Sequence, residues 1–346
     1  MNMLKIMNGM TWEEYILFNR LPGIGLDIGD QTIKIARVKR KRDGLLLIKH
    51  SSMLTPVETV DAGIIHDPER LGKEMKGFVR DLNLNGKQVV SAVTGQQVYT
   101  RNLILPSMKL CELKEAVYYQ AMKFLPIPVE EAAIDICPLR EFEDEEGKKT
   151  EVFFVAIRRH QVENLDIACK FAGLKLAVVE IEPLALYRVL GGNLESVLAF
   201  LEIGSFRSYL AVFKGVTLVF YRSLPFSSSA LYQFYGKGGF KEHEVSEYKQ
   251  YDYVLEDIIS ETKRSVEYYK LGDETGNERI DRFLLCGEGS AIRGLDYRLT
   301  EGLGCKVEVA DILPRLILPS DISEVEKREL KHEFTVTLGL AAREVV

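Results

Sequence analysis

One short pattern occurs twice in this chain of 346 residues and constrains its fold more than any other feature. In each copy an apolar strand delivers an acidic residue and then a glycine into a tight turn, with GLDIG at 25–29 and FLEIG at 200–204. An alternating strand follows each turn, at 32–38 in the first copy and at 208–213 in the second. The repeat predicts a duplicated α/β fold with a cleft.

The two turns also predict a ligand. A turn glycine lets backbone N–H groups approach a phosphate with no Cβ in the way. The acids of the two copies, Asp27 and Glu202, could each hold a hydrated metal ion. We expect the two hairpins to face each other and to grip the polyphosphate of a nucleotide. Lys34, on the returning strand, could meet a β-phosphate as a point charge, or it could point to solvent.

The length and composition of the chain limit its class. A chain of 346 residues exceeds what one hydrophobic core usually supports, so we expect two domains. The net charge of −6 argues against a nucleic-acid binder. The five cysteines lie far apart and away from the histidines, which predicts free thiols in a reducing compartment and no metal cage. No apolar run approaches the roughly 18–20 residues that span a bilayer, so we expect a cytoplasmic protein that reaches a membrane only through a partner.

The first half is expected to begin with an extension and then to follow a β-β-β-α-β order. Residues 1–22 could form a short helix that docks on the domain surface or, as the alternative, contacts a partner or a membrane. Asp67 and Pro68 predict the start of a helix as its N-cap and first-turn proline. A buried strand over 89–93 completes the order, which is that of each half of an actin-like, ribonuclease H-like fold.

Residues from about 100 to 177 break this order and are expected to form a small α+β module inserted into the first half. The module is expected to contain an amphipathic helix over 113–124, an acidic hairpin turn over 141–149, a strand over 152–157 and a helix over 161–172 that ends at Gly173.

The second half repeats the strand pattern and adds a third glycine turn. Gly287, Glu288 and Gly289 follow a buried strand, at a place where ligands bind in open α/β sheets. The other expected elements are a strand over 197–201, a loop region with a short helix over 227–250, a long helix over 251–269, the buried strand over 282–286, a helix over 290–301, a strand over 306–309 and an amphipathic helix over 334–343.

The sequence resembles the type IV pilus assembly protein PilM family, whose members are actin-like and close to the cell-division protein FtsA. The resemblance covers nearly the whole chain. Its motifs are GLDIGDQTIKIARV at 25–38, LPSMKLCELKEAVYYQAMKFLPIP at 105–128, FAGLKLAVVEIEPLALYRVL at 171–190, LEIGSFRSYLAVFKG at 201–215, ETKRSVEYY at 261–269, LLCGEGSAIRGLDYRL at 284–299 and TLGLAAR at 337–343.

The resemblance implies a duplicated actin-like (ribonuclease H-like) fold, with two domains around a nucleotide cleft and an inserted α+β subdomain 1C. The implied boundaries are an N-terminal extension at 1–22, subdomain 1A at 23–99, 178–195 and 335–346, subdomain 1C at 100–177, and domain 2 at 196–334 with subdomain 2B within about 222–275.

The resemblance also implies ATP with Mg²⁺ between the two halves. Asp27 and Glu202 would hold the metal through water, and Glu202 is the candidate catalytic residue. The implied nucleotide-binding residues are Asp27, Gly29, Asp30, Thr32 and Lys34 in the first phosphate loop, Glu202, Gly204, Ser205 and Ser208 in the second, Gly287, Glu288 and Gly289 in the adenosine loop, and Glu261 and Arg264 beside the nucleoside.

Three of these residues depart from the family pattern. Asp30 stands where a small serine-like residue is usual, Glu202 replaces an aspartate, and Glu288 replaces a glycine. A carboxylate about 4 Å from a phosphate costs on the order of 1–4 kcal/mol at surface-like dielectric unless a metal intervenes. The family predicts ATP binding, whereas these residues predict at most a weak ATPase.

The resemblance implies an adaptor function. The protein would lie at the inner face of the cytoplasmic membrane and bind the cytoplasmic N-terminal peptide of PilN in a groove between 1A and 1C. Pilus platform and motor ATPases are further expected partners, self-association is possible, and nucleic acid is not an expected partner. A peptide with apolar anchors could add to the strands and helix of 100–177.

Two other functions remain open from the residues. A small-molecule kinase of the same superfamily needs a catalytic base facing the γ-phosphate, but Asp135 and Asp166 lie in the insertion. An FtsA-like, filament-forming, membrane-tethered protein ends in a linker and an amphipathic membrane helix, whereas this chain stops at 344–346, directly after its last core helix.

Overall fold

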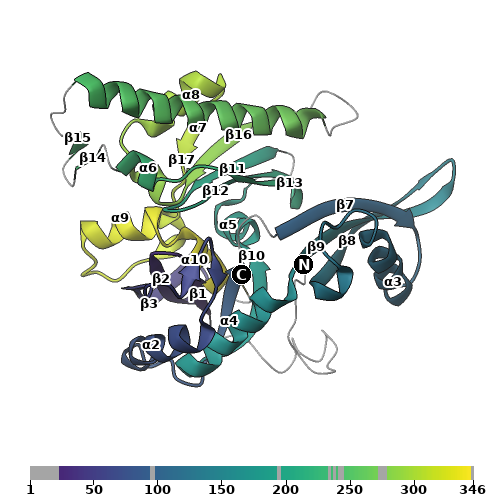
Figure 1. The fold of residues 1–346 in the computed structure, drawn as a ribbon, viewed down its shortest axis with the longest axis horizontal. Coiled ribbons are helices and arrows are strands. Elements are labelled where there is room, and N and C mark those ends of the chain that lie inside the picture. Colours follow the sequence, from purple (N-terminus) through teal and green to yellow (C-terminus); the bar gives the residue numbers. More distant parts are fainter. Residues whose placement is uncertain are drawn as a thin grey trace. The chain divides into compact units, whose positions relative to one another are not determined.

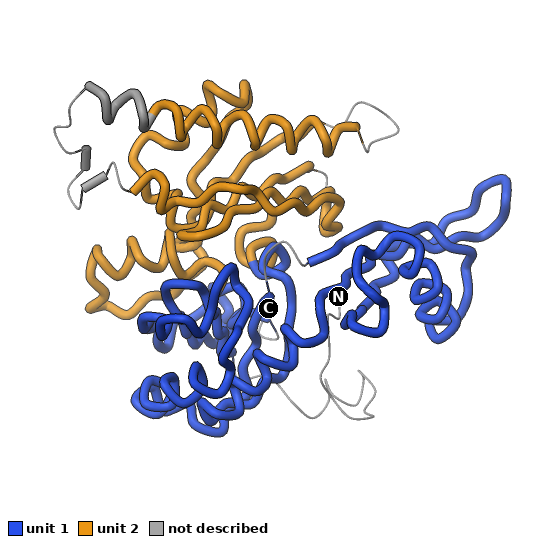
Figure 2. Tube along the Cα trace, viewed as in Figure 1, with its two compact units in different colours: residues 1–185, 337–346 blue, residues 186–336 orange. Residues whose placement is uncertain are grey.

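The computed structural model describes residues 23–93, 98–192, 196–232, 235–236, 239–240, 245–271 and 279–343. The chain divides into two compact units, drawn in two colours in Figure 2, one of residues 1–185 with 337–346 and one of residues 186–336. Each unit is described by itself. The helix expected within 1–22 and part of the loop expected at 227–250 lie outside the described residues.

The main sheet of the first unit contains the strand order β10-β6-β1-β2-β3. The first three strands along the chain pair antiparallel, whereas β6 runs parallel to β1 and β10 runs parallel to β6. The bounds are β1 (Ile24–Ile28), β2 (Thr32–Lys41), β3 (Gly44–Leu54), β6 (Gln88–Val93) and β10 (Lys175–Ile181).

The sheet of the second unit repeats this topology in the order β13-β12-β11-β16-β17. Its first three strands are again antiparallel, and the last two again run parallel to the first. The shared order confirms the predicted duplication of a ribonuclease H-like unit. The bounds are β11 (Val197–Ile203), β12 (Ser208–Lys214), β13 (Thr217–Leu224), β16 (Arg282–Cys286) and β17 (Val307–Val309).

Two helices of the first unit begin and end as the sequence predicts. Helix α2 (Pro68–Asp81) is capped by Asp67, whose side chain accepts a 3.0 Å hydrogen bond from the Arg70 N–H. Helix α4 (Arg159–Ala172) ends at Gly173, which has φ +84°. The two helices lie side by side in Figure 1 and pack so closely that a Cβ on Gly72 would lie 2.4 Å from the Ala168 carbonyl oxygen.

The inserted module has its own sheet and core. Its strands lie in the order β7-β9-β8, and the acidic segment forms the predicted turn between β8 and β9. Because α4 packs on α2 and β10 belongs to the main sheet, we propose that the module ends near Arg158 and not at residue 177. The bounds are β7 (Val98–Pro106), α3 (Leu110–Ala121), η1 (Val129–Glu131), β8 (Ala132–Asp144) and β9 (Gly147–Arg158).

The prediction of a helix over 290–301 is wrong for the first residues of that range. A 3₁₀ turn, η2 (Glu288–Ala291), comes first, and helix α8 (Leu295–Leu303) begins only after Gly294, whose φ of +81° interrupts a right-handed helix. The other helices of the second unit are α6 (Ser229–Tyr232), α7 (Val245–Leu271), η3 (Leu313–Arg315) and α9 (Glu324–His332). The short strands are β4 (Val60–Asp61), β5 (Ile64–Ile65), β14 (Tyr235–Gly236), β15 (Gly239–Phe240) and β18 (Leu316–Ile317).

The C-terminal helix α10 (Thr335–Ala341) is buried rather than amphipathic as predicted. A Cβ on Gly25 of β1 would lie 2.1 Å from the Thr337 carbonyl oxygen. A Cβ on Gly339 would lie 2.2 Å from the carbonyl oxygen of Ala185 in helix α5 (Glu182–Leu190). These close approaches leave the helix no exposed face, because β1 and α5 pack directly on its backbone.

Candidate functional site

The first glycine hairpin joins β1 to β2. The Gly29 N–H donates to the Thr32 carbonyl at 3.0 Å and closes the turn. The hydroxyl of Thr55, just after β3, donates to the Gly29 carbonyl at 2.7 Å, and the Thr55 N–H donates to the Gln31 carbonyl at 2.8 Å. The loop is therefore fixed by the third strand of its own sheet.

Asp27 and Lys34 lie directly opposite each other at the base of this hairpin. They are register partners on β1 and β2, so both side chains project from the same face with Cβ atoms about 5 Å apart. Lys34 is only 8% exposed, which excludes the alternative that it points to solvent. The Thr337 hydroxyl lies 3.4 Å from Asp27 Oδ2. A buried cation at the base of a glycine turn is suited to a phosphate.

Asp30 has a role that the sequence did not suggest. Its Oδ1 accepts a 2.8 Å hydrogen bond from the Gly63 N–H. Gly63 lies in the turn between β4 and β5, where Ala62 and Gly63 have φ of +48° and +65°. The carboxylate that was expected to repel a phosphate thus ties the first loop to a neighbouring strained turn.

The second glycine hairpin, between β11 and β12, reproduces the backbone pattern of the first. The Gly204 N–H donates to the Arg207 carbonyl at 2.9 Å, and the Ser228 N–H, after β13, donates to the Gly204 carbonyl at 2.8 Å. In both units a residue after the third strand bonds the carbonyl of the turn glycine. The duplication therefore extends from the sheet to the hydrogen bonds of its loops.

The third glycine turn packs on the second hairpin. Glu202 is the register partner of Cys286, and a Cβ on Gly287 would lie 2.3 Å from Glu202 Oε1. A Cβ on Gly289 would lie 2.5 Å from Cγ2 of Ile203. Burial, together with the neighbouring Glu202 charge, raises the pKa of the Cys286 thiol well above its usual value. Glycine is required at both positions because Glu202 and Ile203 occupy the space of a side chain.

Ser205 and Glu288 join the two loops of the second unit. The Ser205 hydroxyl donates to Glu288 Oε2 at 2.5 Å, and the Tyr232 hydroxyl donates to the Glu288 carbonyl at 2.8 Å. Burial, followed by the Glu288 charge, raises the pKa of Tyr232 to about 12, so the phenol stays protonated at neutral pH. One predicted phosphate ligand, Ser205, is thus already bonded to a carboxylate.

Two hydroxyls beside the second hairpin have no hydrogen-bond partner. Ser208 and Ser228 are buried, and their Oγ atoms are unpaired in the structure. A buried hydroxyl without a partner costs stability and calls for a water or a ligand at the site. Such donors are suited to a phosphate or to the water of a hydrated metal ion, and the role of Ser208 as a nucleotide ligand stays a prediction.

A histidine of helix α9 contacts the third glycine turn through the hydroxyl of Ser290. The Ser290 hydroxyl donates to the Gly287 carbonyl at 2.6 Å and lies 2.7 Å from His332 Nδ1, at the end of α9. Burial, and then the charges of Lys331 and Arg328, lower the pKa of His332 to about 4. The neutral ring therefore supports the loop at neutral pH. A capping box in the sequence, Ser323 with Glu326, could have revealed α9 but not this contact.

The remaining predicted residues are placed as follows. Glu261 and Arg264 lie on α7 and form an ion pair with each other at 2.5 Å, so their place beside a nucleoside stays a prediction. Among the described residues, no group of three or more His, Cys, Asp or Glu could hold a metal ion. A metal at Asp27 or Glu202 would therefore need water or phosphate ligands.

A buried ion pair of the first unit escaped the sequence analysis. Glu180 of β10 is 0% exposed and pairs with Arg343, which is 8% exposed. The pair joins the last strand of the main sheet to the residues that follow α10. It is structural, because a charge at this depth needs an opposite charge.

One protein family and several solved structures are similar to this chain. The family model described as type IV pilus assembly protein PilM matches residues 25–345. The solved PilM-PilN type IV pilus biogenesis complex is 25% identical, with a TM-score of 0.81, and covers 95% of this chain and 100% of that chain. The protein EutJ from Carboxydothermus hydrogenoformans is 18% identical, with a TM-score of 0.48, over 93% of this chain and 91% of that chain. MreB5 of Spiroplasma citri bound to AMPPNP is 14% identical, with a TM-score of 0.48, over 83% and 90%.

No helix among the described residues is long and apolar enough to cross a membrane. The repeated sheet order and the likeness to the PilM structure confirm the actin-like fold. Because the family model matches almost all of the sequence, the chain belongs to the type IV pilus assembly protein PilM family.

Proposed function

We propose that this protein is an ATP-binding adaptor of the type IV pilus assembly platform, at the inner face of the cytoplasmic membrane. It binds the cytoplasmic N-terminal peptide of a PilN protein in a groove between subdomains 1A and 1C. The observation that carries the proposal is the likeness, at a TM-score of 0.81, to a PilM protein solved in complex with PilN. Contacts with motor ATPases and self-association stay predictions.

The inserted module offers apolar anchors for such a peptide. Ile104, Leu110, Tyr119 and Met122 are large apolar side chains that the module exposes, although its own core is filled. Exposed apolar groups on an independently packed module are typical of a protein-binding surface. A short peptide would bury them and gain affinity from a few deeply placed side chains.

A peptide titration tests this site. We expect saturable binding of a labelled PilN N-terminal peptide to the full chain, and no binding of a scrambled peptide. The double variant Tyr119→Asp and Met122→Asp should weaken binding by about 10-fold or more, because it places charges on the apolar anchors. Tyr253→Asp is the matched control, since Tyr253 is equally exposed on α7. Failure of the wild-type chain to bind the PilN peptide would refute the proposal.

The nucleotide would bind the three glycine turns. Lys34 and the backbone of the first turn would meet phosphates, and Ser208 would supply a hydroxyl. Asp27 and Glu202 would hold Mg²⁺ through water, and the metal would neutralise phosphate charge. Hydrolysis would be slow, because Glu202 packs on Gly287 and would be committed to the water ligands of the metal rather than to an attacking water. Occupancy would bias the domain arrangement and so the affinity for the partner.

A titration of labelled ATP with magnesium, with and without the PilN peptide, tests this second part. We expect ATP binding that changes when the peptide is present, since coupling between two sites is reciprocal. If ATP binds with the same affinity in the presence and absence of the peptide, the adaptor proposal stands, but nucleotide occupancy does not control the affinity for the partner. No ATP binding would remove the nucleotide from the proposal.

A further inference from the structure

The β2–β3 hairpin carries a concentration of positive charge that the proposed function does not use. Residues 37–49, called the basic hairpin here, contain one carboxylate and six cations, and so have a net charge of +5 in a chain of net charge −6. The cations are Arg37, Lys39, Arg40, Lys41, Arg42 and Lys49.

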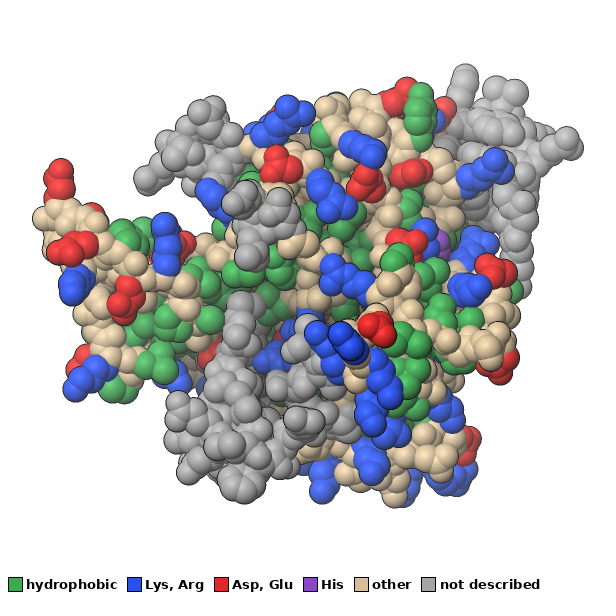
Figure 3. Space-filling view, turned by 180° about the vertical axis from the view of Figure 1, so that it is seen from behind, with side chains coloured by type: hydrophobic (Ala, Val, Ile, Leu, Met, Phe, Trp, Pro, Cys, Tyr) green, Lys and Arg blue, Asp and Glu red, His purple; other side chains and the backbone are tan. Residues whose placement is uncertain are grey.

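The four consecutive cations at the tip of the basic hairpin are accessible. Residues 39–42 are all exposed, and no described carboxylate forms an ion pair with any of them. The turn at Arg42 and Asp43 is tight, because Lys41 pairs with Gly44, whose φ is +144°. Figure 3 shows one face of the molecule on which Lys and Arg side chains gather in a dense group. The tip thus presents fixed, unneutralised charge to its surroundings.

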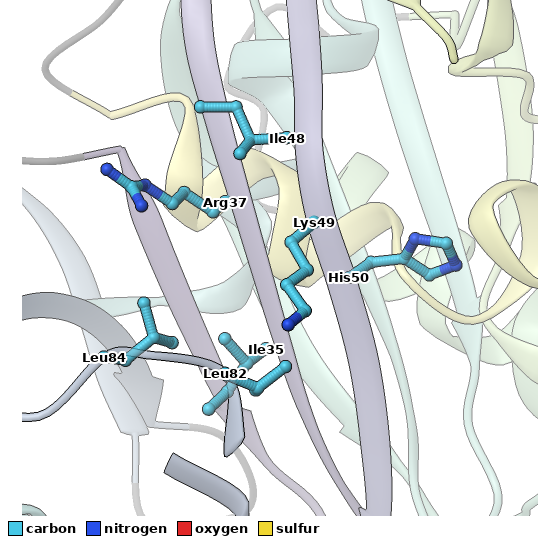
Figure 4. A pocket seen from close by; sticks show the side chains of 7 residues that line it. All are labelled: Ile35, Arg37, Ile48, Lys49, His50, Leu82 and Leu84. Atoms are coloured by element: carbon cyan, nitrogen blue, oxygen red, sulfur yellow. The ribbon is translucent and has the colours of Figure 1, made fainter. Parts of the chain in front are cut away.

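A β-bulge adds an apolar group beside these charges. Arg37 pairs with Lys49 and Val38 pairs with Leu47, so Ile48 is skipped by the register and is 44% exposed. Figure 4 shows Ile48, Arg37 and Lys49 around a cavity of about 40 Å³. The floor of the cavity is apolar, with Ile35, Leu82 and Leu84.

Arg37 has a donor that the protein leaves unused. Its Nε atom is buried and has no hydrogen-bond partner in the structure. A buried guanidinium N–H is costly to leave unpaired, and its best partners are phosphate and carboxylate oxygens. The cavity beside it is large enough for a water or a single anionic oxygen. The hairpin therefore combines exposed cations, an apolar side chain and an unpaired buried donor.

We propose that the basic hairpin docks on the anionic phospholipid headgroups of a membrane surface. A surface of many anionic groups can neutralise all the cations together without fixed geometry, at about 1 kcal/mol per Lys or Arg. Ile48 can enter the boundary between headgroups and acyl chains. Single-stranded nucleic acid is a poorer fit, because residues 37–49 contain no aromatic side chain on which a base could stack.

This contact would be weak alone and would gain strength from a second membrane contact. A single polybasic patch gives reversible attachment, and a partner held in the same membrane raises the local concentration. The inference does not rest on the PilN proposal, since a lipid surface is bound without any partner.

Vesicle flotation of the full chain tests the inference. Vesicles of phosphatidylcholine with about 30% phosphatidylglycerol should retain the protein at low salt, and pure phosphatidylcholine should not. The variant Lys39→Gln, Arg40→Gln, Lys41→Gln and Arg42→Gln should lose on the order of 1,000-fold in partitioning. The control variant, of equal charge, changes four exposed cations outside the inserted module to Gln, at Arg70, Lys76, Lys87 and Lys263, and should keep most of the binding.

The outcomes separate the inference from the alternatives. Ile48→Ser should lower partitioning by about 3- to 10-fold with little dependence on salt. Equal losses in the two charge variants, or no binding of the wild type to anionic vesicles, would overturn the inference. Tighter binding to duplex DNA than to vesicles would also overturn it, in favour of nucleic acid. The PilN peptide should bind both charge variants like the wild type, so failure of either proposal is visible by itself.

Discussion

The two glycine hairpins share one backbone but differ in the side chains around it. In the first, Asp27 faces Lys34 across the strand pair, whereas in the second Glu202 faces Tyr209. The first loop is anchored outward through Asp30 to Gly63, and the second is joined to the next glycine turn through Ser205 and Glu288. Duplication has thus preserved the turn and its hydrogen bonds, while the register position opposite the acid holds a cation, Lys34, in the first hairpin and Tyr209 in the second.

The last strands of the two sheets, β10 and β17, differ in how deeply their ion-paired glutamates are buried. Glu180 on β10 is fully buried against Arg343, whereas Glu308 on β17 is 34% exposed and pairs with Arg282 and Lys306. The hydrogen bonds from Lys306 and then Arg282 lower the pKa of Glu308. The fifth strand therefore carries a buried ion pair in one unit and a solvated ion pair in the other.

The largest expected effect comes from breaking the buried pair. Arg343→Met should destabilise the protein by about 3–5 kcal/mol, because it leaves the Glu180 charge buried without its partner. Glu308→Gln should cost less than about 1 kcal/mol, since its partners are exposed. Urea unfolding of the two variants measures the difference. Equal costs would show that the two fifth strands are energetically alike.

Lys34 should dominate nucleotide affinity. Lys34→Met should weaken ATP binding by about 10- to 100-fold, because it removes the buried charge of the first hairpin. Tyr209→Phe, at the matching register position of the second hairpin, should change affinity by less than about 3-fold. Calorimetric titration checks this, with thermal melting to confirm that both variants are folded. A larger loss for Tyr209→Phe would reverse the assignment of the phosphate contact.

Releasing Ser205 should strengthen nucleotide binding. Glu288→Gln removes a negative charge next to the proposed phosphate site and loosens the Ser205 hydrogen bond, so ATP affinity should rise by about 10-fold. Asp30→Asn should have less effect, because Asp30 is bonded to the Gly63 N–H. The same titration reads both variants. Weaker ATP binding by Glu288→Gln would mean that the Glu288 carboxylate contributes to nucleotide binding and does not oppose it.

The smallest effect concerns pH. The pKa of His332 is lowered to about 4 in the folded protein, below its usual 6.5, so unfolding takes up a proton between these values. Stability should be full above about pH 6.5 and should fall by at most about 1 kcal/mol toward pH 4, after allowance for solvent screening. His332→Gln should make this part of the pH profile flatter. If His332→Gln leaves the pH dependence of stability unchanged, groups other than His332 cause the loss of stability at low pH.

The sequence was sufficient for most strands of the two repeated sheets and for their glycine turns because these signals are local, whereas β7 and β10 were not predicted. An apolar strand ending in glycine, or an Asp-Pro helix start, is visible within a few residues, and both were found where expected. The side-chain partners of the site were not visible. Asp30 and Gly63 are 33 residues apart, Ser205 and Glu288 are 83 apart, and Glu180 and Arg343 are 163 apart. No spacing rule connects such pairs, because only the finished fold brings them together.

The burial of α10 has a consequence for how the protein is made. The first unit needs residues 337–343, which lie against Gly25 and Glu180, yet these residues leave the ribosome after the whole of the second unit. The second unit is contiguous, so it can fold during synthesis while β10 still holds an uncompensated carboxylate. We therefore expect the N-terminal half to mature last, and a nascent chain to be most vulnerable to proteases in the part that was translated first.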